Sequence, residues 1–205
     1  MATIRDIMIM APVIPVLVIE AIEHAQPLAE ALVAGGLPCL EVTLRTDCAL
    51  AAIKIMRRVP GAIVGAGTVL NGQDLAAAID AGAEFIVSPG LTDMLGRAAI
   101  ASGIPFLPGI ATSADIMRGL DMGLSHFKFF PAEANGGLPA LKALAGPFGM
   151  ASFCPTGGIT AKTALDWLVH PQVLCVGGSW LVPKGTPDIV QISAAARAAS
   201  SLTAI

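Results

Sequence analysis

Tyrosine is absent from this 205-residue sequence, aromatic residues make up only 4% of it and charged residues only 13%. Hydrophobic residues nevertheless account for 55%, and they are mostly Ala, Val, Leu and Ile. Low charge combined with high apolar content excludes a disordered chain. No segment rich in charge or in Ser and Pro divides the sequence. We therefore expect one folded domain over residues 1–205.

Long apolar runs are also missing. The longest run without a charged residue, 143–161, contains two prolines and four glycines, so we expect no membrane-spanning helix. The apolar stretch 7–19 is interrupted by Pro12 and Pro15 and has no cleavage site behind it, so we do not expect a secretion signal. Lys and Arg are scattered and the net charge is −3, which argues against a nucleic-acid partner.

The four cysteines form no CxxC pair, and three of them lie in apolar, strand-like runs. We interpret Cys39, Cys48, Cys154 and Cys175 as reduced thiols, which is typical of a cytoplasmic protein.

Several catalytic motifs are absent as well. The sequence contains neither HExxH nor GxSxG, and His24, His126 and His170 have no metal-ligand spacing. We therefore expect no metal, no other cofactor and no hydrolase triad.

What is present is a repeated alternation of a short β-branched run, a turn and an Ala- and Leu-rich segment with helical spacing. Strands are expected at 13–19, 39–44, 63–69, 85–88, 105–108, 126–130, 152–155 and 173–176. Helices are expected near 21–34, 47–59, 72–81, 93–102, 113–122, 138–145, 161–168 and 188–199. Expected N-caps are Thr46, Asn71, Thr92, Thr112 and Thr160, and expected helix stops are Gly35-Gly36, Gly82, Gly103 and Gly123.

Eight strand–helix units suit either an open doubly wound sheet or a closed barrel. An open dinucleotide-binding sheet carries GxGxxG after its first strand, whereas here the first strand leads into Glu20-Ala21-Ile22-Glu23 without a glycine. The fold predicted is an eight-stranded parallel (β/α)8 TIM barrel. Glycine pairs after strands seven and eight, Gly157-Gly158 and Gly177-Gly178, agree with the position of barrel phosphate sites.

Polar residues occupy strand positions that should be apolar. In the run 39–45, Leu40, Val42 and Leu44 face the helices, so Glu41, Thr43 and Arg45 point into the barrel or its C-terminal mouth. Burying a charge at these positions costs free energy unless the charge is paired or serves catalysis or binding. A structural ion pair is one explanation, and a catalytic role is preferred because catalytic groups lie at the C-terminal ends of barrel strands.

Lys128 stands among Phe127, Phe129 and Phe130 in a chain with only five lysines. Apolar surroundings disfavour the ammonium form, and the neutral amine can attack a carbonyl carbon. The alternative is a buried lysine paired to Glu41 for structure alone. The other lysines, Lys54, Lys142, Lys162 and Lys184, are interpreted as solvated.

Thr68 and Thr156 end strands three and seven, and with Glu41 and Lys128 they form a polar ring at one mouth. A reactive amine, a carboxylate, an arginine suited to a carboxylate and a phosphate cradle together indicate carbonyl chemistry through a Schiff base.

The sequence resembles the family of 2-keto-3-deoxy-6-phosphogluconate (KDPG) aldolases that also act on 4-hydroxy-2-oxoglutarate (KHG). The resemblance is carried by seven runs from strand two to strand eight, of which the run around Lys128 is highly specific. These are Glu41-Val42-Thr43-Leu44-Arg45, Gly65-Ala66-Gly67-Thr68, Ser88-Pro89-Gly90, Phe127-Lys128-Phe129-Phe130-Pro131-Ala132-Glu133, Asn135-Gly136-Gly137, Pro155-Thr156-Gly157-Gly158 and Gly177-Gly178-Ser179-Trp180.

The resemblance implies a metal-free class I aldolase that splits KDPG into pyruvate and D-glyceraldehyde 3-phosphate in the Entner–Doudoroff pathway, and a homotrimer. It makes Lys128 the Schiff-base lysine, Glu41 the general acid and base, and Thr156 the residue linked to stereochemistry at C4. The positions that it implies for substrate binding are Arg45, Thr68, Pro89, Phe130, Thr156, Gly157, Gly158, Gly178 and Ser179.

Three alternatives remain at this point: an aldolase for the galactonate epimer, a phosphosugar-binding barrel without catalysis, and a phosphosugar isomerase. Thr156 discriminates the galactonate epimer, because its hydroxyl can bond a C4 hydroxyl of only one configuration. The presence of Glu41 and Lys128 argues against a barrel without catalysis, and an isomerase needs no buried lysine.

Overall fold

The computed structural model describes residues 2–202, in which strands and helices alternate along the chain. The strands are β1 (Val13–Leu17), β2 (Cys39–Thr43), β3 (Ile63–Gly67), β4 (Ile86–Val87), β5 (Phe106–Leu107), β6 (Gly109–Ile110), β7 (His126–Phe129), β8 (Ser152–Pro155) and β9 (Val176–Gly178). The helices are α1 (Ile4–Ile9), η1 (Ile22–His24, a 3-10 turn), α2 (Ala25–Ala34), α3 (Ala49–Met56), α4 (Gly72–Asp80), α5 (Asp93–Ser102), α6 (Ser113–Asp121), α7 (Gly137–Ala145), α8 (Ala164–Leu168) and α9 (Ile189–Ser200).

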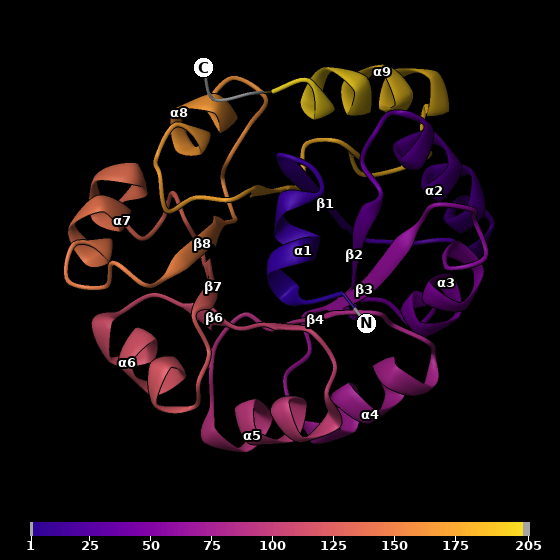
Figure 1. Ribbon diagram of the computed structural model, residues 1–205. Coiled ribbons are helices and arrows are strands. Elements are labelled where there is room, and N and C mark those ends of the chain that lie inside the picture. The colour runs from indigo at the N-terminus through magenta and orange to yellow at the C-terminus, as the bar shows by residue number, and fades with distance from the viewer. Residues whose placement is uncertain (1, 203–205) are drawn as a thin grey trace.

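All strand pairs are parallel, in a six-stranded sheet of order β5-β4-β3-β2-β1-β9 and a three-stranded sheet of order β6-β7-β8. Only Pro108 separates β5 from β6. Isolated parallel bridges join Phe153 to Val173 and Thr156 to Gly177. The sheet is curled, and Figure 1 shows α2 to α9 around its outside. The α/β fold with a curled parallel sheet is therefore confirmed.

Several expected boundaries were wrong. The expected strand 105–108 is shortened to β5, and Pro108, which lacks the N–H that a ladder needs, separates it from a further strand, β6. The last strand begins at Val176 instead of 173. Asn71, Thr92 and Thr112 cap α4, α5 and α6 as predicted. Thr46 instead donates to the Ile19 carbonyl, and Thr160 lies before a turn that postpones α8 to Ala164.

Helix α1 was not predicted at all. Thr3 and Asp6 form a capping box at its start. This start signal was missed because residues 7–19 were interpreted as one apolar stretch. Figure 1 places α1 across one end of the curled sheet. There Ile7 and Met8 are buried against residues at the start of the strands, and the Cys39 thiol donates to the Ile7 carbonyl over 3.6 Å.

Strand side chains alternate between two apolar clusters. Outward residues such as Leu40 and Val42 pack with the helices in an outer core, as the alternation predicted, and Phe127 lies in the same cluster. Inward residues form a smaller group, here called the inner core: Ile7, Met8, Ile14, Cys39, Phe85, Val87, Leu107, Cys154 and Cys175. All four cysteines are free thiols. None of the helices described within residues 2–202 combines the length and hydropathy needed to cross a bilayer.

Candidate functional site

The centre of the site is a buried ion pair between strands of the two sheets. Lys128 on β7 extends its Nζ to within 3.0 Å of Glu41 Oε1 and 3.4 Å of Oε2 on β2. Glu41 is 3% exposed and Lys128 5%. The predicted inward orientation of both side chains is confirmed. Their charges balance inside the curled sheet, which is how buried charge is tolerated.

The surroundings of Lys128 are less uniformly apolar than the sequence suggested. Phe127 and Phe129 point to the outer core. Phe130 alone of the three stands by the amine, with its ring centroid 5.3 Å from Nζ. The amine therefore has both an aromatic ring and a carboxylate near it, and each of these groups attracts a cation. A neutral amine requires transfer of the proton, and Glu41 is the neighbouring acceptor.

Glycines beside the site make room for protein side chains. A Cβ on Gly67 would overlap Glu41 Oε1, one on Gly65 would overlap the Phe85 ring, and one on Gly177 would overlap Thr156 Oγ1. The space beside Gly65 and Gly67 is therefore filled by Phe85 and Glu41 and is not open to a ligand.

Arg45 and Thr68 meet at the ends of β2 and β3. Arg45 Nε donates to Thr68 Oγ1 over 3.2 Å, and Arg45 is exposed. Thr68 has a φ of 58°, the one positive value at a non-glycine residue among those described. A threonine held in this region is strained, and such strain is common where a side chain must be aimed at a ligand. No sequence pattern predicted this conformation of Thr68.

The loop after β8 contains the expected glycines in a conformation that requires them. Gly157 and Gly158 have φ values of 104° and 81°. The loop is held by the segment after β7, since Ala132 N donates to Thr156 O at 2.8 Å and Glu133 N to Gly157 O at 3.0 Å. Thr156 itself is 5% exposed. The segment that follows Lys128 thus supports the predicted phosphate loop.

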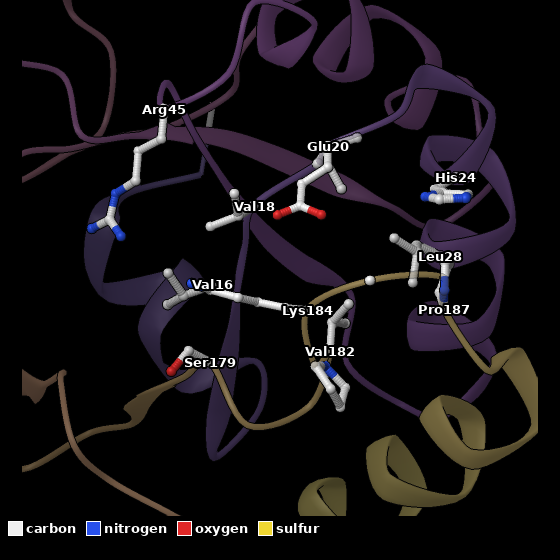
Figure 2. Close-up of a pocket in the computed structure, with 13 residues that line it drawn as sticks. Val16, Val18, Glu20, His24, Leu28, Arg45, Ser179, Val182, Lys184 and Pro187 are labelled. Carbon is white, nitrogen blue, oxygen red and sulfur yellow. The ribbon is translucent and has the colours of Figure 1, made fainter.

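The remaining predicted positions lie at neighbouring strand ends. Pro89 follows β4 in a turn where Ser88 Oγ donates to Gly90 O at 2.7 Å. It abuts Gly109, which is in register with Lys128. Gly178 ends β9, and Ser179 is exposed directly after it. Ser179 and Arg45 line one cavity of about 310 Å³ (Figure 2). Lys184, expected to be solvated, is exposed but also lines this cavity.

Thiols and a histidine lie deeper in the strands, toward α1. Burial raises the pKa of Cys39 to about 12. A hydrogen bond to Cys154, together with burial, raises the pKa of Cys175 well above its ordinary value. Burial lowers the pKa of His126, and the Arg5 charge adds to this effect. The raised pKa values of Cys39 and Cys175 favour the thiol over the nucleophilic thiolate, which is typical of buried structural cysteines. Within residues 2–202 no group of three His, Cys, Asp or Glu residues is arranged to hold a metal ion.

Comparison with known proteins finds similar sequences and similar solved structures. The chain is 61% identical over 201 residues to the 2-dehydro-3-deoxy-phosphogluconate aldolase of Zymomonas mobilis, with 98% of this chain and 97% of the relative covered. A crystal structure of the KDPG aldolase of that organism with 3-phosphoglycerate has a TM-score of 0.97 at 60% identity and covers 98% of both chains. The KDPG aldolase of Legionella pneumophila, with pyruvate captured at low pH as a covalent carbinolamine, has a TM-score of 0.94 at 46% identity, with 98% of this chain and 99% of that chain covered.

These similarities do not favour the galactonate-specific, non-catalytic or isomerase alternatives. A sequence model of the family described as KDPG and KHG aldolase matches residues 4–195. The motif resemblance from strand two to strand eight is thereby confirmed. Because the family match and the 61% identity both extend over nearly the whole sequence, the chain belongs to the KDPG and KHG aldolase family.

Proposed function

We propose that this aldolase cleaves KDPG to pyruvate and D-glyceraldehyde 3-phosphate, and also acts on KHG, through a Schiff base on Lys128. The observation that carries the proposal is the buried contact of 3.0 Å between Lys128 Nζ and Glu41 Oε1. It joins the one strand lysine to the one strand carboxylate in the polar part of the curled sheet. The carbinolamine of the Legionella pneumophila relative supports amine chemistry of this kind.

The reaction begins with proton transfer from Lys128 to Glu41, which frees the lone pair of the amine. The amine adds to the C2 ketone, and Glu41 returns the proton to the departing hydroxyl as water leaves. The protonated imine then accepts the electrons of the C3–C4 bond while Glu41 takes the C4 hydroxyl proton. This step releases the aldehyde and leaves an enamine. Protonation of C3 by Glu41 and hydrolysis of the imine release pyruvate and restore the amine.

Substrate orientation is assigned to the residues around the pair. Arg45, held by Thr68 at 3.2 Å, binds the C1 carboxylate. Phe130 and Pro89 enclose the pyruvyl part, and the Thr156 hydroxyl bonds the C4 hydroxyl. Backbone N–H groups of Gly157, Gly158, Gly178 and Ser179 bind the phosphate. The 3-phosphoglycerate bound by the Zymomonas mobilis relative supports a site for a phosphorylated acid.

We also infer that the two sheets act as one closed (β/α)8 barrel and that residues 1–205 form one domain. The bridges from Phe153 to Val173 and from Thr156 to Gly177 support closure between β8 and β9. The single proline between β5 and β6 supports continuity there. The proposed enzyme works without a metal or another cofactor, as a homotrimer in the cytoplasm, where four free thiols are stable.

Reductive trapping tests the assignment. Borohydride added with pyruvate should inactivate the protein and leave one reduced pyruvate on the peptide that contains Lys128, because only an imine is reduced to a stable adduct. Lys128→Ala should lose both trapping and cleavage, while Lys54→Ala, at an exposed lysine on α3, should keep both. Labelling at another lysine, or cleavage by Lys128→Ala, would contradict the mechanism.

A further inference from the structure

The cavity lined by Arg45 and Ser179 contains a further cation, Lys184, that the proposed mechanism does not use. The cavity, of about 310 Å³, lies between the end of β1, the start of α2 and the segment after β9. This volume lies in the range of small-molecule sites. Because Arg45 and Ser179 both line it, the cavity is continuous with the proposed substrate site.

Its charged lining consists of Arg45, Lys184 and Glu20, and His24 also faces it. In Figure 2 the Lys184 side chain extends from the segment after β9 toward Val16, on the side where Arg45 and Ser179 lie, whereas Glu20 lies above it. Among residues 2–202, no carboxylate lies within 4.0 Å of the Lys184 ammonium. Its charge is available to a ligand in the cavity.

The segment that carries Lys184 is restricted. Pro183 precedes Lys184, Pro187 follows three residues later, and Gly185 between them has a φ of 96°. Proline fixes its own φ and limits the residue before it, so Pro183 and Pro187 restrict the backbone on both sides of the Lys184–Gly185 turn. The segment begins at Ser179, directly after β9. Ser179 and Lys184 are therefore held on one side of the same cavity.

We propose that Lys184 is a specificity-determining residue that pairs with the substrate phosphate and favours KDPG over unphosphorylated KHG. The inference rests on the proposed function. The two substrates share the atoms from C1 to the C4 hydroxyl, but the KDPG phosphorus lies three bonds farther from C4 than the distal carboxylate carbon of KHG. A flexible lysine side chain that extends into the cavity from its edge can pair with the doubly charged phosphate at the far end of KDPG. The carboxylate of Glu20 repels the phosphate of KDPG, and the positive charge of Lys184 also offsets this repulsion.

The test compares kcat/KM for the two substrates in the parent, Lys184→Met, Lys184→Arg and Lys54→Met. In Lys184→Met the ratio of KDPG to KHG activity should fall about tenfold, mainly through KM for KDPG, since a charge-assisted contact is lost. Lys184→Arg should restore most of the ratio. Lys54→Met, which removes the same charge from an exposed site on α3, should keep the parent ratio.

An unchanged ratio in Lys184→Met, or equal losses for both substrates, would overturn the proposal. Trapping of pyruvate by borohydride, measured on the same samples, separates this failure from failure of the proposed function. If Lys128 is trapped in parent and variant while the ratio stays constant, only the role of Lys184 is wrong. If the parent neither traps pyruvate nor cleaves KDPG, the proposed function itself is wrong.

Discussion

The two ends of the curled sheet's interior differ although the same strands build both. At the end covered by α1, the inner core is apolar and contains Met8, Cys39 and Phe85. Two residues farther along the same face of β2, Cys39 gives way to Glu41, and Cys154 on β8 gives way to Thr156 just after that strand. One end is closed by a helix and the other opens to a cavity. The apolar layer is thus separate from the polar layer in which we propose the chemistry, a division typical of barrel enzymes.

The largest effect expected from breaking this separation is at the polar end. Glu41→Gln should lower turnover by roughly 10²–10⁴-fold, the usual contribution of positioned acid and base catalysis. Steady-state cleavage of KDPG measures the loss, and a thermal melt of the same sample checks the fold, since Lys128 loses its partner at 3.0 Å. Unchanged turnover would return Glu41 to the role of a structural ion-pair partner.

The apolar end should respond in stability instead. Met8 is 0% exposed under α1, so Met8→Ala should cost about 2–5 kcal/mol of the free energy of unfolding. Met94, which is 86% exposed on α5, is the matched control. Met94→Ala should change the free energy of unfolding by less than about 0.5 kcal/mol. Urea titration measures both. Equal effects would mean that α1 does not seal the inner core.

A smaller change at the polar end tests the choice of substrate. Thr156→Val keeps the shape and deletes one hydroxyl, whose loss costs about 0.5–3 kcal/mol. Cleavage of KDPG should therefore fall roughly three- to hundredfold, at about 1.4 kcal/mol per tenfold. Cleavage of the galactonate epimer should fall less, and trapping of pyruvate, which lacks C4, should hardly change. Equal losses for both epimers would make Thr156 a scaffold residue only.

The smallest effect concerns pH. Burial lowers the pKa of His126 from its ordinary value of 6.5, so the unfolded chain binds the proton more readily. Stability is then complete above about pH 6.5 and falls as the pH drops from there toward the lower folded pKa. Between pH 7.5 and 5.5 the parent should lose more stability in urea than His126→Gln does. His170, with a pKa also lowered by burial, leaves a residual slope in the variant. Identical slopes would contradict this account.

Local patterns predicted part of the arrangement. Alternation along 39–45 predicted that Glu41 points inward, and Lys128 was expected near it in a polar ring; the structure confirms that the two side chains are buried and meet. Cap residues predicted the starts of α4, α5 and α6. These signals are local, because the geometry of a strand or a helix start depends on neighbouring residues.

The sequence by itself determined which strand positions are polar and which side of the strand Glu41 faces, since both follow from residue type and strand periodicity. Only the tertiary structure decided how close they come, because Glu41 and Lys128 are 87 residues apart in sequence and meet at 3.0 Å through the packing of two sheets. It also decided that Gly67 makes room for Glu41, that Thr68 takes a φ of 58°, and that Lys184 reaches the cavity beside Arg45. Each of these depends on atoms from distant segments, which periodicity along one segment does not record.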